Sequence, residues 1–247
     1  MTTIGYHGSH EQFSPRELLD YVQHAEDAGF DAAMCSDHFR PWNHAQGHSG
    51  YSFAWLGAAL QATSLPMGLV CAPGYRHHPA VVAQAVATLE VMFPGRVWAS
   101  FGSGQALNES ITGEPWPTKS ERNERLRECV DVIRDLWAGK TVTHHGHIDV
   151  VDATLYTRPE RPPPAFAAAI TPETARVSPE AFLFEGASIG RCCAAGTTFS
   201  PRSTHADRQQ NSIKQWPSGD PGRASRRMVS TRSSRAFTAK TWTPPIC

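Results

Sequence analysis

The chain has 247 residues, and its 23 Lys and Arg are balanced by 23 Asp and Glu, so the formal net charge is zero. A chain of this length can bury a sizeable core in one large domain or two small ones. The balanced charge gives no indication of nucleic-acid binding, and no apolar run approaches the roughly 20 residues that cross a membrane. The N-terminus lacks the basic and apolar regions of a secretory signal, so a cytoplasmic protein is expected.

Charge and composition divide the chain into two parts. Residues 177–247 contain ten Lys and Arg but four Asp and Glu, whereas residues 1–176 contain 13 and 19. After Arg176 the periodic apolar pattern stops, and Ser, Arg, Thr and Pro become frequent, a composition that buries little surface. We therefore predict a folded domain over 1–176 and an atypical basic tail over 177–247. The tail is interpreted as disordered, as a frameshifted segment that truncates the domain, or as a small second domain.

Strands and helices are predicted to alternate up to residue 170. In chain order they are a strand at 2–7, a helix from Ser14 to Gly29, a strand at 30–36, a helix at 55–63, a strand at 67–72, a helix from Pro79 to Phe93, a strand at 96–101, a helix at 119–138 and a strand at 165–170. The best-marked start is Ser14, because Glu17 completes a capping box. Strands that recur about every 30 residues, with helices between them, are typical of parallel βα units.

This alternation fits either an open doubly wound sheet or a barrel. Five strands precede residue 171, and an eight-stranded barrel needs three more, which the remaining sequence does not indicate. Cys35 and Cys71 lie in apolar, strand-like runs and are predicted to be reduced, buried thiols. Cys192 and Cys193 are adjacent, so they are poorly placed to bridge each other or to bind one metal.

Polar residues follow two of the predicted strands, at the edge where parallel α/β folds place their sites. Asp37-His38 follows the second strand and supplies a carboxylate next to an imidazole that can titrate near neutral pH. Gly102-Ser103-Gly104 follows the fourth and allows close backbone approach to a flat or anionic ligand. Taken alone, the first pair is also common as a structural cap. The second is also common as a tight turn, and Leu107 replaces the third glycine of a dinucleotide fingerprint.

Four segments, taken together and in this order, resemble the luciferase-like superfamily: Ser36-Asp37-His38-Phe39-x-Pro41-Trp42, His78-Pro79-Ala80-x-x-Ala83-Gln84-Ala85, Phe93-Pro94-Gly95-Arg96, and Gly102-Ser103-Gly104-x-Ala106-Leu107-Asn108-Glu109. The similarity covers residues 3–176 and is greatest to the branch with deazaflavin-dependent glucose-6-phosphate dehydrogenases and their FMN-assigned relatives. It implies an α/β fold of the (β/α)8 TIM-barrel family, here incomplete, with about five βα units and an irregular C-terminal tail. It also implies an oxidoreductase that uses FMN or the 5-deazaflavin coenzyme F420.

The resemblance further implies hydride transfer or monooxygenation on an unidentified small organic substrate, and a chain able to form a homodimer. No metal is implied. His38 would be the acid/base and Trp42 would flank the substrate, while the implied cofactor contacts are Asp37, Ala72, Ser103, Gly104 and Asn108.

One residue departs from that branch. Gln105 stands where the sugar-phosphate dehydrogenases carry a catalytic glutamate, and an amide can form hydrogen bonds but cannot exchange a proton as a carboxylic acid does. The residues that bind the substrate phosphate in that branch lie in the later barrel, where this chain has no matching sequence. Glucose 6-phosphate is therefore not the expected substrate.

Two other interpretations remain open. The chain can be a truncated, inactive remnant of such an enzyme, because an incomplete barrel exposes sheet edges and part of its core. It can also be a metal-dependent barrel hydrolase, whose candidate ligands are His7, His10, His77, His78, His144, His145 and His147. The spacing of His7 and His10 is not the usual His-x-His pair of such enzymes, and 144–147 is expected to be an exposed turn.

Overall fold

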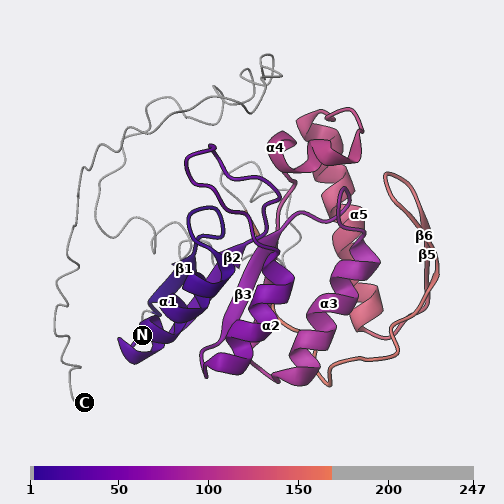
Figure 1. The fold of residues 1–247 in the computed structure, drawn as a ribbon. Helices are drawn as coiled ribbons and strands as arrows, with labels where there is room; N and C mark the ends of the chain where they lie inside the picture. The colour runs from indigo at the N-terminus through magenta and orange to yellow at the C-terminus, as the bar shows by residue number, and fades with distance from the viewer. Residues whose placement is uncertain (1–2, 169–247) are drawn as a thin grey trace. The chain divides into compact units, whose positions relative to one another are not determined.

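A computed structural model describes residues 3–168 of the chain. Within them, five parallel strands form one sheet in the order β1-β2-β3-β4-β7, of which Figure 1 labels the first three. The strands are β1 (Gly5–Gly8), β2 (Ala32–Ser36), β3 (Met67–Cys71), β4 (Val97–Phe101) and β7 (Ala165–Ala167). All five predicted strands are therefore present, and their parallel pairing confirms the predicted βα units. The predicted tail at 177–247, with Cys192 and Cys193, lies outside the described residues.

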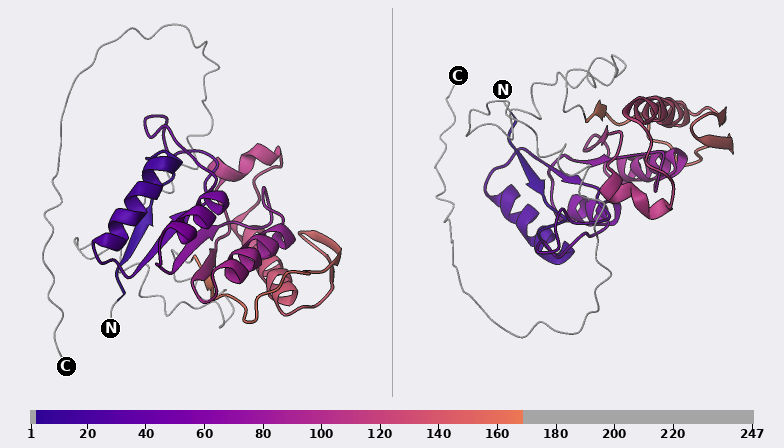
Figure 2. Two further views of the ribbon diagram at one scale, coloured as in Figure 1. Left: turned by 60° about the horizontal axis from the view of Figure 1, so that its bottom comes forward. Right: turned by 90° about the horizontal axis from the view of Figure 1, so that it is seen from above.

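The helices between these strands lie on one face of the sheet (Figures 1 and 2). They are α1 (Pro15–Asp27), α2 (Ser52–Ala62), α3 (Pro79–Met92) and α5 (Lys119–Trp137), with α5 packed against α3. Strand residues alternate between the two faces. Cys35, Leu69 and Ala99 share the helix-covered face and are fully buried. The helices and this face of the sheet thus form one apolar core.

The opposite face of the sheet depends on one close backbone approach. Register places Gly68 beside Trp98 of the next strand. A Cβ at Gly68 would lie 2.0 Å from the Trp98 indole, so only glycine fits beneath this ring. Trp98 also packs edge-on against Phe166 of β7, with ring centroids 5.7 Å apart.

Local sequence signals explain the helix ends well. Ser14 and Glu17 form the predicted capping box at the start of α1, and Gly29 follows the helix with a φ of 84°. Helix α2 begins at Ser52, three residues before its predicted start. The prediction missed this start because the N-cap, Tyr51, forms no side-chain hydrogen bond and is not a typical capping residue. The short helix α4 (Ala106–Glu109) and the 3-10 turn at Ser110–Thr112 were not predicted.

An antiparallel hairpin, β5 (Val142–His145) and β6 (Asp149–Ala153), follows α5 and corrects one prediction. The expected exposed turn at 144–147 is wrong at its first two positions, since His144 and His145 belong to β5. Val142 and Val150 are buried and anchor the hairpin. His144 also pairs with Glu128 of α5, with Nε2 3.0 Å from the carboxylate.

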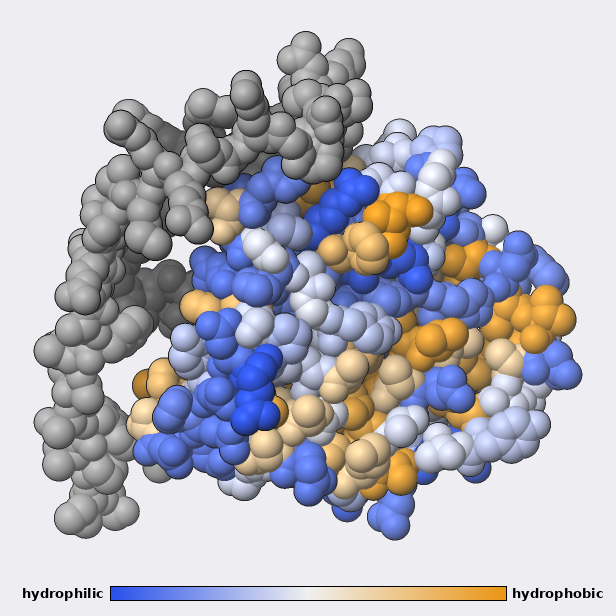
Figure 3. Space-filling view, viewed as in Figure 1, coloured by the Kyte–Doolittle hydropathy of each residue, from blue (hydrophilic) through white to orange (hydrophobic). Residues whose placement is uncertain are grey.

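The surface of the described residues is mixed in character. On the face in Figure 3, hydrophobic residues lie among hydrophilic ones, over α3 and the hairpin. The exposed large hydrophobic residues of the described part include Met92 of α3 and Val151 of β6, which are 57% and 71% exposed. None of the helices between residues 3 and 168 is long and apolar enough to cross a membrane. Cys35 and Cys71 are free and buried, as predicted, and so is Cys129.

Candidate functional site

The carboxyl ends of β1 to β4 lie along one edge of the sheet because the strands are parallel. Shortly after each strand end comes a polar residue that is buried or nearly buried. These residues are Glu11 after β1, Asp37 after β2, Arg76 after β3 and Asn108 after β4. Contacts among their neighbours connect the four loops into one polar edge.

Asp37 is the most heavily bonded of these residues. Its Oδ1 accepts a hydrogen bond from the Ser52 hydroxyl at 2.7 Å. Its Oδ2 lies 2.7 Å from both Arg76 Nη2 and His77 Nε2. Arg76 also donates to the Asp37 carbonyl at 2.6 Å and extends to Glu109, with Nε 3.3 Å from the carboxylate. The guanidinium therefore links the ends of β2, β3 and β4.

The pKa values of the Asp37 and Glu109 carboxyl groups shift in opposite directions. Burial alone would raise the pKa of Asp37, but the hydrogen bond from His77 and the charge of Arg76 lower it to about 2. Burial raises the pKa of Glu109, and its longer contacts with Arg76 offset this only in part. His77 Nε2 also lies 2.8 Å from Arg76 Nη1, and one tautomer cannot serve both neighbours. Because Asp37 is ionised, we assign the Nε2 proton to the bond with its carboxylate.

His38 is held by a carboxylate from the neighbouring strand. Its Nδ1 forms a short hydrogen bond with Oε1 of Glu11, a residue only 2% exposed. The Ser9 hydroxyl donates to the other oxygen of Glu11 at 2.7 Å. Burial raises the pKa of Glu11, but the hydrogen bonds from His38 and Ser9 lower it to about 2. The ring of Trp42, 40% exposed, meets the imidazole edge-on with centroids 5.2 Å apart.

Asn108 fixes the loop that carries His38. Its Oδ1 accepts hydrogen bonds from the backbone N–H groups of Phe39 at 3.0 Å and Arg40 at 3.1 Å. Its Nδ2 donates to Oε1 of Gln105 at 3.3 Å. Gln105 is also the N-cap of α4, although its side chain forms no capping bond. The start of α4 is thereby tied to the loop after β2.

The turn after β4 combines small residues with one hydroxyl. Gly104 has a φ of 77°, and a Cβ there would lie 3.5 Å from Ala72 Cβ and 3.3 Å from the Trp116 ring. Ser103 accepts a hydrogen bond from Lys119 Nζ at 2.8 Å. Ala72, Gly102 and Gly104 thus place little side-chain bulk at the ends of β3 and β4. Such an edge fits a planar ring.

The histidines considered as ligands of a metal hydrolase form hydrogen bonds and ring contacts with residues other than histidine. His7 Nε2 lies 3.2 Å from the Ser36 hydroxyl, and His10 packs edge-on against Trp55, with burial lowering its pKa. His145 and His147 contact carboxylates of the hairpin and of α5. Within residues 3–168, no three His, Cys, Asp or Glu side chains are grouped as metal ligands.

The predicted site residues thus fall into connected groups. His38 contacts Trp42, Asn108 contacts Gln105, and Ala72 lies beside Gly104. Sequence reasoning missed Glu11, Arg76 and Ser52 and gave Glu109 no role. Glu11 could have been found by inspecting every strand end, because it follows the first strand by three residues.

A family model described as luciferase-like monooxygenase matches residues 1–182. The chain belongs to the luciferase-like monooxygenase family. This membership confirms the predicted superfamily and its barrel-type α/β fold.

Similar proteins include F420-dependent dehydrogenases that are 41–46% identical to this chain. The chain is 46% identical over 181 residues to an F420-dependent glucose-6-phosphate dehydrogenase of Beutenbergia cavernae. The matched segment covers 72% of this chain and 54% of the relative. The chain is also 46% identical over 178 residues to the enzyme of that name from Microbacterium testaceum, covering 71% and 53%. A solved F420-dependent secondary alcohol dehydrogenase, in complex with an F420-acetone adduct, is 41% identical, with a TM-score of 0.69 over 71% of this chain and 55% of that one. The chain therefore spans about half the length of the relatives it matches.

Proposed function

We propose that this protein is an F420-dependent oxidoreductase that takes a hydride from the carbinol carbon of a small organic alcohol. The observation that carries the proposal is the pairing of His38 with buried Glu11 beside Trp42, at the carboxyl edge of the sheet. Support for the cofactor comes from relatives at 41–46% identity whose names specify F420. The proposed site residues are those that the sequence indicated, together with Glu11.

The His38–Glu11 pair can act as a general base. Since the ionised Glu11 accepts the Nδ1 proton, Nε2 of His38 is left as the acceptor for a substrate proton. As the alcohol is oxidised, its O–H proton passes to Nε2 while the electron pair of the C–H bond leaves as hydride. When bound, the deazaflavin ring supplies a planar two-electron acceptor for that hydride. Trp42 shields the reacting carbon from water.

The proposed cofactor edge consists of Ala72, Ser103 and Gly104, and Asn108 is the fourth proposed contact. The small residues leave room for a ring, and the Ser103 hydroxyl can bind a polar substituent on it. The oxygens of Asp37 already accept bonds from Ser52, His77 and Arg76. We propose that Asp37 supports this edge mainly by fixing the loops, because any direct contact with the cofactor has to share those oxygens.

The substrate class follows from Gln105. Its amide can hydrogen-bond a substrate oxygen but cannot act as an acid, so His38 is the proton-transfer group of the proposed site. A secondary alcohol, with one proton to lose from oxygen, needs no more than that. We infer a small-molecule substrate of this kind rather than a sugar phosphate.

The test is a spectroscopic titration of the full chain with F420 and separately with FMN, followed by reduction assays with secondary alcohols. We expect saturable F420 binding, and His38→Ala should retain it while slowing reduction by about 100-fold or more. His24→Ala, on the exposed side of α1, is the matched control and should change neither quantity. Failure of the folded chain to bind F420, or undiminished reduction by His38→Ala, would contradict the proposal. If the chain binds FMN but not F420, the proposed cofactor becomes FMN.

A further inference from the structure

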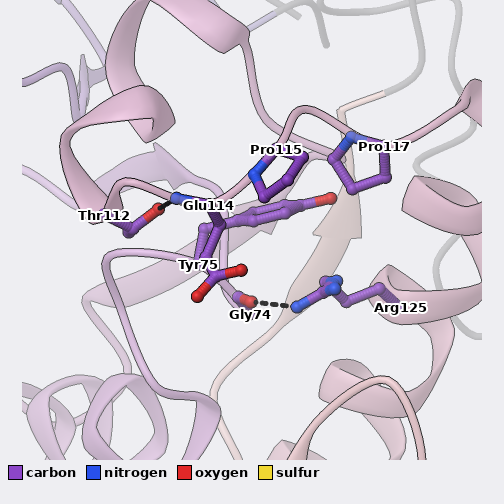
Figure 4. A pocket seen from close by; sticks show the side chains of 7 residues that line it. All are labelled: Gly74, Tyr75, Thr112, Glu114, Pro115, Pro117 and Arg125. Atoms are coloured by element: carbon purple, nitrogen blue, oxygen red, sulfur yellow. Dashed lines mark hydrogen bonds between the residues drawn. The ribbon is translucent and has the colours of Figure 1, made fainter.

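A recess lies beside the proposed cofactor edge and belongs to none of the groups described above. It has a volume of about 360 Å³. Its walls come from the loop after β3 and from the segment between α4 and α5 (Figure 4). The lining residues are Gly74, Tyr75, Thr112, Glu114, Pro115, Pro117 and Arg125.

Arg125 of α5 lines this recess, and Arg122 lies one turn earlier on the same helix; each guanidinium lies over an aromatic ring. The guanidinium of Arg125 lies 4.7 Å from the centre of the Tyr75 ring, and that of Arg122 lies 4.7 Å from the Trp116 ring. The two rings are 5.3 Å apart. Stacking on an aromatic ring fixes the orientation of a guanidinium and leaves its N–H groups available to an oxyanion.

The hydrogen bonds of these arginines are incomplete. Arg125 donates from Nη1 to the Gly74 carbonyl at 3.0 Å, while its buried Nε has no partner among residues 3–168. Among the described residues, the Arg122 side chain forms one hydrogen bond, from Nε to the Thr118 carbonyl at 3.4 Å. Within residues 3–168, neither guanidinium has a carboxylate within 4.0 Å. The Tyr75 hydroxyl is also buried and has no hydrogen-bond partner in the described part of the chain.

Unpaired buried donors are costly, and an oxyanion would satisfy several of them at once. Arg122 is only 8% exposed, and this burial lowers the pKa of its guanidinium. The opposing group is Glu114, an exposed residue on the recess wall whose carboxylate can turn toward water. We propose that Tyr75, Arg122 and Arg125 form a binding site for an oxyanion of the phosphate or carboxylate type.

The position of this site suggests what carries the oxyanion. Trp116, beneath Arg122, also lies 3.3 Å from where a Cβ of Gly104 would stand, so the recess adjoins the proposed cofactor edge. An elongated ligand with its ring at Gly104 could place an acidic chain at Arg125. The acidic chain of F420 and a separate phosphorylated molecule share this chemistry. The test therefore has two arms, one with phosphate and one with the cofactor. The cofactor arm rests on the proposed function, whereas the phosphate arm does not.

The phosphate arm is calorimetric titration of the full chain with inorganic phosphate at constant ionic strength. Phosphate should bind saturably, and Arg125→Gln should weaken it about 10-fold, the effect of losing one charge-assisted contact. Tyr75→Phe should weaken it by a smaller factor, and Glu114→Gln should strengthen it. Arg16→Gln on α1 removes the same charge from a side chain that is 83% exposed, and should leave binding unchanged. Equal phosphate binding by Arg125→Gln and Arg16→Gln, or no binding at all, overturns the proposal.

The cofactor arm compares F420 with its ribityl deazaflavin fragment, which keeps the ring but lacks the phosphate and the acidic tail. If the tail occupies the recess, the intact chain binds F420 more tightly than the fragment, and Arg125→Gln loses most of that preference without changing fragment binding. If phosphate binding is lost in Arg125→Gln but the preference persists, the site stands and takes a separate phosphorylated ligand. If neither ring binds, the proposed function fails, and the phosphate arm decides the oxyanion site alone.

Discussion

Replacing Asp37 with Asn should reveal how much the polar edge depends on one charge. The carboxylate is fully buried and accepts bonds from Arg76, His77 and Ser52. Folding lowers its pKa from 3.8 to about 2, which corresponds to about 2–3 kcal/mol of stability at neutral pH. Breaking a buried ion pair typically costs about 3–5 kcal/mol. Because Arg76 keeps Glu109 as a partner, we expect a cost for Asp37→Asn of about 3 kcal/mol, the lower end.

The sign of the pH dependence follows from the lowered pKa. The contribution of Asp37 is fully present above its unfolded-state pKa of 3.8 and disappears as the pH falls toward 2. Urea unfolding followed by circular dichroism should therefore give a large difference between the variant and the intact chain at pH 7, and a smaller one near pH 2. The control Asp20→Asn removes an exposed partner of Arg16 and should cost no more than about 0.5 kcal/mol. A cost for Asp37→Asn as small as the control's, or one that is equal at both pH values, would refute this reasoning.

Three further changes probe the same edge. Glu11→Gln should lower the turnover of the F420 reaction by about 10- to 100-fold and shift its pH profile, because the amide no longer fixes the His38 tautomer; an unshifted profile would exclude this positioning role. Asn108→Ala should lower the free energy of unfolding in urea by about 1–3 kcal/mol, since two backbone N–H groups lose their acceptor. Asn108→Asp keeps an acceptor and should lower it less; equal losses in the two variants would argue against these hydrogen bonds. Gly104→Ala should destabilise more than Gly113→Ala, which shares a positive φ but has open space around it, by about 1 kcal/mol of added crowding; equal melting temperatures would contradict this.

Much of the fold could be predicted because its signals are local. The capping box at Ser14 and the glycines after α1 and α5 mark helix ends through short-range hydrogen bonds and backbone conformation. The early start of α2 could not be predicted, because its N-cap Tyr51 forms no side-chain capping bond and the hydroxyl of the next residue, Ser52, bonds to Asp37, 15 residues away. The hairpin was missed because its strands are short and their polar histidines are typical of a turn. The contact between His144 and Glu128 of α5 appears only in the folded structure.

The site was predicted in part for a similar reason. Motif resemblance pointed to Asp37, His38 and Gly104, whose neighbours in the sequence carry the pattern. Glu11 and Arg76 gain their importance only through partners 27 and 39 residues away in the chain. A single sequence does not show such pairs, since nothing local distinguishes these side chains from solvated charges.

Strand β7 gives the sheet an order of assembly. Each of the first four strands pairs with a neighbour 27 to 34 residues away, as from Gly5 to Ala32 or from Ala33 to Met67. Ala99 and Ala165, paired across β4 and β7, are 66 residues apart. Doubling the length of the closed loop adds about 0.6 kcal/mol of entropic cost, and longer-range pairing slows folding. The first four strands can therefore assemble as they leave the ribosome, while the fifth joins only after α5 and its hairpin have been made.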